Sequence, residues 1–337
     1  MVKICNQCGT KYPAAYDRCR KCGAPLADIV STPKIKDIKT HPNKYYNFRN
    51  YSNSFNEISE LLSDENIKKL KEFSLTESQF EEIIENIKKT YRMILNNLID
   101  DYRIDFESLS TVDKVLLFTK SFVKTEYKEG GGDLGNFAFN EIYIDDRASR
   151  ALQITTILHE LSHFLIAEIL EQIVSILLKT NKTDVVEAFV CYTLVNDSFN
   201  YLLDEYCAHT VEGRYALLGY QDYGSYEDKL NEFEDKDPRL IEVANEIGNT
   251  FAFYIKDIIG SFITEDLRED IKEEFNNIND PPKFSQLRHE TSVVYEWERF
   301  SHALEIILIK KLDDILNNSD DFENLNKYAV KFRINNS

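Results

Sequence analysis

One long helical pattern, from about residue 149 to 179, contains the stretch TTILHELSHFLIAEI. Positions four apart lie on the same face of a helix, so His159 and His163 can both reach one metal ion. Glu160 is rotated from that face by about a quarter turn, where a general base for a metal-bound water belongs. The alternative is an ordinary amphipathic helix whose two histidines lie at the edge of the core.

Four cysteines near the start of the chain form two pairs, CNQC and CRKC, each followed by glycine. A CxxC turn aims two sulfur atoms at one point, and two such turns supply the four thiolates of a tetrahedral zinc site. The pattern resembles a zinc ribbon over residues 1–26, with a structural zinc because four protein ligands leave no open position. Two redox-active pairs are the alternative, and they would need a surrounding βαβ pattern. The expected ligands are Cys5, Cys8, Cys19 and Cys22.

The charge of the chain is unevenly distributed. The net charge is −18, but residues 1–50 hold ten Lys or Arg against three Asp, which leaves −25 for the remainder. An acidic body does not attract nucleic acid. The basic ribbon could bind a protein or another acidic partner, or rest against the acidic body. We find no signal-peptide pattern, and charged residues interrupt the most apolar segment, 164–178, so we expect a cytoplasmic protein without a membrane span.

Beyond a linker at 27–55, the apolar pattern is helical almost throughout. Around 130–144 a glycine-rich turn leads into residues that read as strand. Its glycines spell GxGxxG, but they follow a helix, which excludes a dinucleotide fingerprint. We predict a mainly α (α+β) fold, with a core over 56–222 that includes a small antiparallel sheet or hairpin. A helical C-terminal region, 223–337, packs on it. The expected helices cover 75–102, 109–127, 149–179, 183–218, a segment from Asp237-Pro238, 264–277, 283–317 and 320–331.

A third ligand is expected from the helix that follows residue 180. If 149–179 and 183–217 form an antiparallel hairpin that turns near 181, residue 159 lies level with 203, and 163 with 199. Position 205 then falls within one turn of His159. A carboxylate there completes a set of two histidines and one glutamate, with the fourth position open for water. The polar residues at spacings of three or four make one stripe: Asp197, Tyr201, Glu205, His209 and Glu212.

HELSH, followed by EYCAH at 205–209, makes residues 110–218 resemble a gluzincin-type zinc metallopeptidase. In several such families the second motif is ExxAD, and in this chain His209 occupies the position where aspartate is usual. The resemblance implies a zincin-like fold and a catalytic zinc held by His159, His163 and Glu205. His209 then either orients a ligand histidine or is itself a ligand, and a ligand role for Glu212 stays open. The alternative is that Asp204, Glu205 and Glu212 form a solvated face.

The resemblance implies hydrolysis of peptide bonds in a peptide or protein substrate. Zinc would polarise the scissile carbonyl and acidify a water, while Glu160 takes the proton and passes it to the leaving amine. The strand near 137–144 would pair with an extended substrate. Three residues are candidates for stabilising an oxyanion, unless they only pack: Tyr201, Arg214 and Tyr215. The alternative function is a non-catalytic zincin-like protein whose ribbon is an adaptor for protein or nucleic acid. An ester or non-peptide amide substrate also stays open.

Overall fold

The computed structural model describes part of the 337 residues, namely 2–5, 7, 10–13, 16–24, 26–28, 34–39, 55–128, 134–217, 220, 223–231, 233, 238–278 and 290–336. These residues form a mainly helical body and two small sheets. The mainly α fold class is therefore confirmed. The predicted glycine-rich turn at 129–133 lies outside the described residues.

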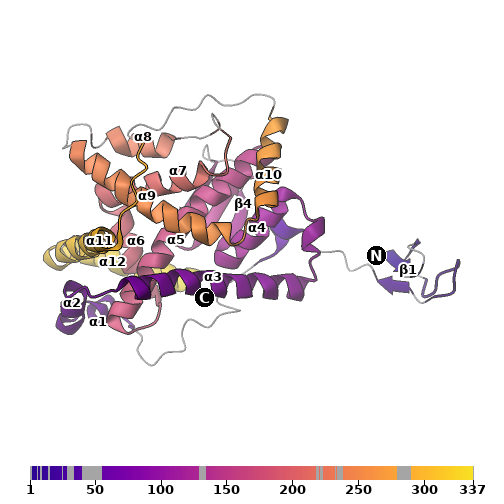
Figure 1. Ribbon diagram of the computed structural model, residues 1–337. Coiled ribbons are helices and arrows are strands. Elements are labelled where there is room, and N and C mark those ends of the chain that lie inside the picture. Colours follow the sequence, from indigo (N-terminus) through magenta and orange to yellow (C-terminus); the bar gives the residue numbers. More distant parts are fainter. Residues whose placement is uncertain are drawn as a thin grey trace.

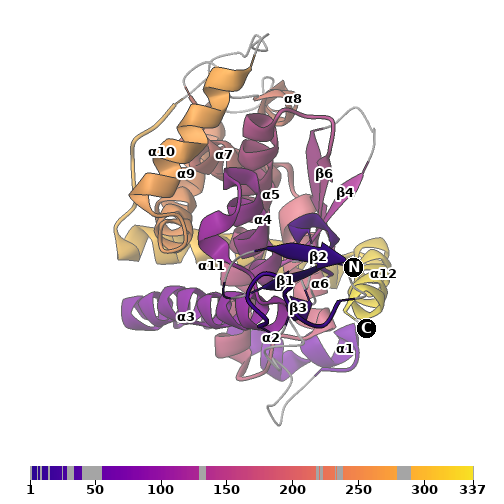
Figure 2. The same ribbon diagram turned by 90° about the vertical axis from the view of Figure 1, so that its right-hand side faces the viewer.

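Helix α5 (Arg150–Leu178) runs through the middle of the body, as Figures 1 and 2 show. The Ser149 hydroxyl caps it by accepting a hydrogen bond from the Leu152 amide. Neighbouring helices bury its apolar side chains on almost every side. Among the described helices, α5 alone has the length and composition of a membrane span, and 72% of that window is buried inside the protein.

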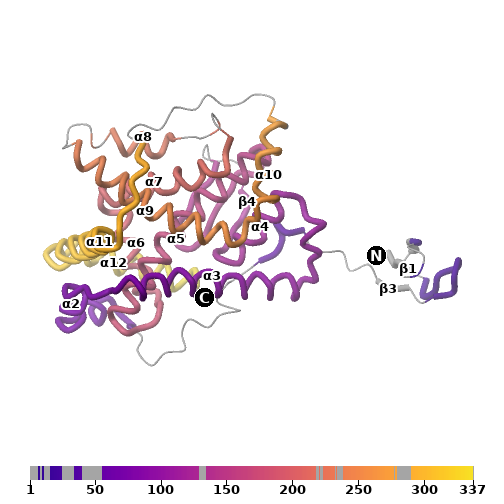
Figure 3. Tube along the Cα trace, viewed as in Figure 1, coloured from indigo at the N-terminus to yellow at the C-terminus, as the bar shows by residue number. Residues whose placement is uncertain are grey.

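The helices that pack on α5 come from both halves of the chain. They are α2 (Asp64–Lys71), α3 (Glu77–Tyr102), α4 (Thr111–Phe122), α6 (Asp184–Val195), α7 (Ser198–Glu212), α9 (Pro238–Gly260) and α10 (Glu265–Glu274). Figure 3 traces this order along the chain. The remaining described helices lie around this group: α1 (Ile58–Leu61), α8 (Gly224–Asn231), α11 (Trp297–Asn317) and α12 (Ser319–Asn335). Of these, α8 contacts α7, and α12 packs on α6.

Two helix starts follow the predicted signals. Thr76 and Gln79 form the expected capping box at the start of α3, each side chain bonding to the other's backbone amide. Helix α9 begins at Pro238, where proline costs no hydrogen bond because the first amides of a helix have no partner within it. Both helix starts could be predicted from the sequence because capping depends on neighbouring residues.

The predicted helix over 109–127 is wrong in its last turn. Helix α4 ends at Phe122, and β4 (Lys124–Lys128) follows. This strand lies parallel to β6 (Glu141–Asp145), and β5 (Gly135–Ala138) pairs antiparallel on the other side of β6. The sheet is therefore mixed, and the predicted hairpin is its β5–β6 part. Pairing with β6 overrides the helical pattern of this segment because it satisfies the strand's backbone groups.

The predicted continuous helix over 183–218 is two helices. The break falls at Asn196-Asp197, between α6 and α7. The Asp197 carboxylate accepts hydrogen bonds from the amides of Phe199 and Asn200, and so caps α7. The simple hairpin geometry is therefore wrong, and α7 reaches α5 after a turn. The predicted helix over 283–317 is also wrong at its start, since residues 290–296 are not helical and α11 begins at Trp297.

The N-terminal strands β1 (Val2–Cys5), β2 (Lys11–Pro13) and β3 (Leu26–Asp28) form an antiparallel sheet with β1 in the centre. From the linker, the described segment 34–39 buries Ile35 and Ile38. The buried Lys120 ammonium donates hydrogen bonds to the Ile38 and Thr125 carbonyls, at 2.8 and 2.7 Å. These contacts hold this part of the linker on the end of α4.

Candidate metal centre

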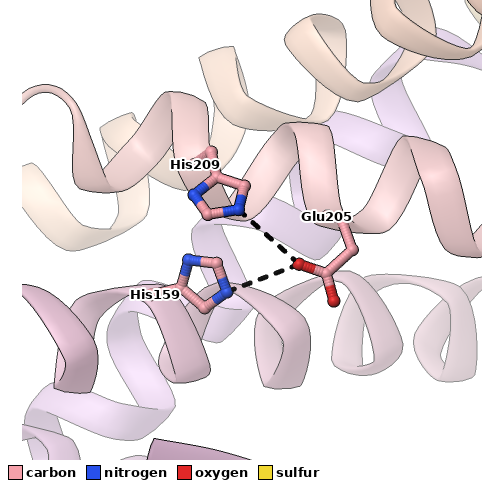
Figure 4. A group of neighbouring side chains, drawn as sticks. All are labelled: His159, Glu205 and His209. Atoms are coloured by element: carbon pink, nitrogen blue, oxygen red, sulfur yellow. Dashed lines mark ion pairs between the residues drawn. The ribbon is translucent and has the colours of Figure 1, made fainter. Parts of the chain in front are cut away.

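The two histidines of HELSH face α7 from the middle of α5. Helices α5 and α7 lie side by side, and α7 supplies the buried Glu205, which is 4% exposed. Figure 4 shows the imidazoles of His159 and His209 on one side of the Glu205 carboxylate, with an ion pair drawn from one of its oxygens to each ring. The polar stripe on α7 therefore faces the core, and the alternative of a solvated face is wrong.

Donor atoms of three side chains face one another between the helices. The Nε2 atoms of His159 and His163 lie 3.2 Å apart. Glu205 Oε2 lies 3.6 Å from His159 Nε2, and Glu205 Oε1 lies 3.9 Å from His163 Nε2. Two nitrogen ligands of one tetrahedral zinc lie about 3.3 Å apart, given zinc–nitrogen bonds of about 2.0–2.1 Å. The two imidazole nitrogens therefore have the mutual spacing that such an ion requires, and Glu205 turns a different oxygen toward each of them.

A separate carboxylate faces the outer nitrogen of each imidazole. His163 Nδ1 lies 3.0 Å from Asp204 Oδ2, and His159 Nδ1 lies 3.2 Å from Glu212 Oε2. In metal sites, a carboxylate on the far nitrogen fixes the ring orientation and the tautomer, and makes the other nitrogen a better ligand. Asp204 and Glu212 are suited to this task. Neither role was predicted from the sequence.

His209 completes, with His159 and Glu205, the described donor set whose ligand atoms all lie within 4.8 Å of one another. Its Nε2 lies 3.8 Å from Glu205 Oε2 and 3.1 Å from the hydroxyl of Ser225. Ser225, on α8, also donates a hydrogen bond of 2.6 Å to Glu205 Oε2. His209 Nε2 is thus occupied by a hydroxyl, whereas His163 Nε2 faces His159 directly. Ser225 was missed because no sequence signal ties α8 to this cluster.

Burial and charge shift the protonation of the cluster. Burial opposes a charged imidazole, but the carboxylates of Glu205 and Glu212 raise the pKa of His159 well above its usual value. Against the same burial cost, Asp204 raises the pKa of His163 to about 9. Burial lowers the pKa of His209. Without a metal, the surrounding carboxylates therefore favour protonation of the His159 and His163 imidazoles, and a cation that binds there must compete with protons.

Glu160 lies beside this cluster, under the edge strand β5. Its carboxylate accepts a hydrogen bond from the Phe137 amide, and burial nevertheless raises its pKa. A side-chain carbon at Gly135 would come within 2.3 Å of the Thr156 methyl group and 3.2 Å of Glu160 Oε1. Glycine is required there because the strand passes so close to the helix.

A cavity of about 540 Å³ opens over the cluster. Both candidate ligand sets, Glu160 and Tyr201 line it, as does the start of β5. Arg214 and Tyr215 are not among the described lining residues, and Tyr215 is buried with 1% exposure. Of the three candidates for stabilising an oxyanion, Tyr201 is therefore the one that lines the cavity beside the candidate metal ligands.

The N-terminal cysteines are described in part. Gly23 has φ +75°, and the amides of Cys19 and Gly23 bond to the carbonyls of Ala24 and Cys19. The Lys21 amide lies 3.4 Å from Cys19 Sγ. This is the tight turn expected after a CxxC pair. Cys8 lies outside the described residues, as does the side chain of Cys5, so the structural zinc stays a prediction.

Comparison of the chain with protein-family models, curated proteins and solved structures found no match.

Proposed function

We propose that this protein is a zinc-dependent metallopeptidase whose catalytic zinc is held by His159, His163 and Glu205. The observation that carries the proposal is the convergence of these three donors, at 3.2, 3.6 and 3.9 Å, at the edge of a cavity. Two imidazoles and one carboxylate from the protein are a ligand set of hydrolytic zinc sites, which keep a further position open.

The donor types alone also suit the iron(II) of non-haem oxygenases. Glu160 favours zinc hydrolysis, because a buried carboxylate next to the ligands is what a hydrolytic site needs as a base. The adjacent positions of His159 and Glu160 on α5 hold this carboxylate close to the metal ligands without making it one of them. When bound, zinc acts as a Lewis acid and makes water acidic near neutral pH.

Glu160 would take the proton from the attacking water and deliver it to the leaving amine. Its raised pKa suits both steps, because a carboxyl group that titrates closer to neutral pH is a better acid after it has acted as a base. The cavity also contains Tyr201, whose pKa is raised by burial and by Glu205. A neutral tyrosine there would donate a hydrogen bond to the oxyanion.

The edge strand β5 would hold the substrate in an extended form. It pairs with β6 on one side, and residues Leu134 to Phe137 line the cavity. An unpaired strand edge binds an extended peptide through backbone hydrogen bonds. A peptide is therefore favoured over a compact substrate.

The test compares the zinc-loaded wild type with Glu160→Gln on a mixed peptide library, with products identified by mass spectrometry. We expect cleavage by the wild type, a fall of at least about 10²- to 10⁴-fold in the variant, and equal zinc content in both. Glu82→Gln, an exposed residue of α3, is the matched control and should cleave normally. A Glu160→Gln protein as active as the wild type would refute the base, and no cleavage by any zinc-loaded sample would refute the function.

A further inference from the structure

The cavity over the metal cluster is lined by acidic groups. Six carboxylate side chains and three histidines contribute to its walls, and among the described residues no lysine or arginine does. Four of the carboxylates belong to the cluster already described. The remaining two are Glu171 on α5 and Asp228 on α8. Of these two, Glu171 is buried at 2% exposure.

Glu171 lies at the far end of the cavity from the metal ligands. It follows His163 by two helical turns, about 12 Å along the axis of α5. Ala167 lies between them, one turn from each, and its small side chain also lines the cavity. Leu194 and Phe332 line the cavity as apolar walls. The result is an apolar passage with a carboxylate at its end.

This carboxylate belongs to a buried group that is short of positive charge. Lys182 Nζ lies 2.6 Å from Glu168 Oε2, 2.6 Å from Glu171 Oε2 and 3.7 Å from Glu187 Oε1. One ammonium thus serves three carboxylates. Because unpaired buried charges are costly, a second cation would be stabilising there.

The three carboxylates differ in their other partners. Gln172 donates to Glu168 at 3.0 Å, and Asn140 and Asn336 donate to Glu187 at 2.8 and 2.7 Å. Glu171 Oε2 is buried and accepts no hydrogen bond of acceptable geometry, although Lys182 is close. Consistent with this, burial and the neighbouring carboxylates raise the pKa of Glu171 to about 8 despite Lys182. The least satisfied carboxylate is therefore the one that lines the cavity.

We infer that the passage from His163 to Glu171 is a specificity pocket for a lysine or arginine side chain next to the bond that is cleaved. This inference rests on the proposed function. The long stem of such a side chain would lie between Leu194 and Phe332, and its charged end would reach Glu171. A free amino terminus carries a similar charge, but it lies two bonds from the carbonyl carbon. It would stay beside the metal ligands and could not reach Glu171.

The experiment uses the zinc-loaded full chain and peptides capped at both ends. The peptides differ only in having arginine, lysine or norleucine on either side of the cleaved bond. A charge-assisted contact is worth about 1.5–3 kcal/mol, so kcat/KM should favour the basic peptides by about 10- to 100-fold at one of the two positions. In Glu171→Gln the ratio of basic to norleucine peptide should fall to about 1–3. Ala167→Leu, which narrows the passage, should lower the same ratio without changing any charge.

Asp228→Asn is the matched control, because it removes one carboxylate from another wall of the cavity, and the ratio should stay within about twofold of the wild type. Cleavage without any preference for a basic residue would overturn the pocket and leave the proposed function standing. The norleucine peptide is also tested with a free amino terminus, and a preference for this form over the capped one would overturn the pocket too, because the cation would then be the amino terminus.

If no peptide is cleaved, the proposed function fails, and binding decides the pocket. Binding is measured with the zinc-loaded Glu160→Gln protein. The pocket is supported if the arginine peptide binds more tightly than the norleucine peptide, and if this difference disappears when Glu171→Gln is added. Equal binding of the arginine and norleucine peptides would refute it.

Discussion

Two groups of buried carboxylates lie along helix α5, and they differ in the source of the positive charge beside them. Near its C-terminal end, Glu168, Glu171 and Glu187 surround Lys182, so the chain supplies the cation itself. Near its middle, carboxylates surround His159 and His163. There, no lysine or arginine of the described residues pairs with the carboxylates. This difference supports the proposal that the second group binds a metal ion.

The histidine geometry strengthens this contrast. Two Nε2 atoms that face each other at 3.2 Å can share one proton, but two protons between them would repel. A metal ion accepts both nitrogens at once. A bound metal ion would therefore satisfy the donors of the histidine group together, whereas in the other group Lys182 Nζ lies 2.6 Å from both Glu168 Oε2 and Glu171 Oε2.

Replacement of Lys182 by methionine should have the largest effect on stability. Removing one partner of a buried ionic group costs about 3–5 kcal/mol, because the remaining charges lose their compensation. Urea denaturation measures the loss. Lys68→Met is the control, since the Lys68–Glu72 pair is exposed on α2 and contributes at most about 1 kcal/mol. A loss in Lys182→Met no larger than in Lys68→Met would show that this cluster needs no internal cation.

Asp204→Asn should weaken zinc binding without abolishing it. The carboxylate 3.0 Å from His163 Nδ1 orients a ligand, and loss of such a group typically costs 10- to 100-fold in metal affinity. Competition with a chromophoric chelator measures this affinity. His163→Ala should lose one zinc per chain, whereas His209→Ala should keep it. The opposite pattern would assign the ligand position of His163 to His209.

The pH dependence should differ between the metal-free and zinc-loaded protein. The pKa of His163 is raised to about 9 without metal, mainly by Asp204 against the cost of burial. Its charged form therefore stabilises the metal-free fold fully below about pH 6.5, and this contribution is lost as pH rises through about 9. Zinc binding should strengthen over the same range, because fewer protons compete.

Urea denaturation with and without chelator, from pH 6 to 9, measures the difference between the two states. Other groups titrate in both states and cancel in that difference. If the difference in the free energy of unfolding between the zinc-loaded and metal-free protein does not grow with pH, the raised pKa of His163 is contradicted.

The smallest expected effect is that of Glu171→Gln on stability. Because burial and the neighbouring carboxylates raise the pKa of Glu171 to about 8, its carboxyl is mostly uncharged at pH 6, so we expect an amide of similar shape to change the free energy of unfolding by no more than about 1 kcal/mol. Since the pKa of Glu171 is raised to about 8, the wild type loses stability as pH rises from about 4.5 through 8, and the variant should lose less. Urea denaturation at pH 6 and 8.5 measures this. An equal loss in both proteins would show that Glu171 does not titrate there.

The sequence predicted the local features well. The capping box at Thr76, the extent of α5 and the start of α9 at Pro238 depend on neighbouring residues alone. The HELSH spacing likewise predicted that His159 and His163 lie on one face. Glu205 also lies near His159, although the hairpin used to place it does not exist.

The remaining features depend on contacts between distant segments. Strand β4 exists because β6 pairs with it, and the Asn196-Asp197 break was hidden in an otherwise helical run. Ser225 reaches Glu205 because α8 folds back over α7, which no local pattern encodes. Asp204 adjoins Glu205 in sequence, yet its partner is His163 on another helix. Such pairings become visible once α5 and α7 are placed side by side.

The most direct test of the metal centre is an anomalous difference map at the zinc edge, from crystals of the zinc-loaded protein. The account predicts a peak at about 2.0–2.2 Å from the Nε2 atoms of His159 and His163 and from a Glu205 oxygen. We also expect His209 to remain hydrogen-bonded to Ser225, and the coordination position of the zinc that faces the cavity to hold no protein ligand. Absence of that peak, or a zinc closed off by His209 as a fourth ligand, would contradict a catalytic metal.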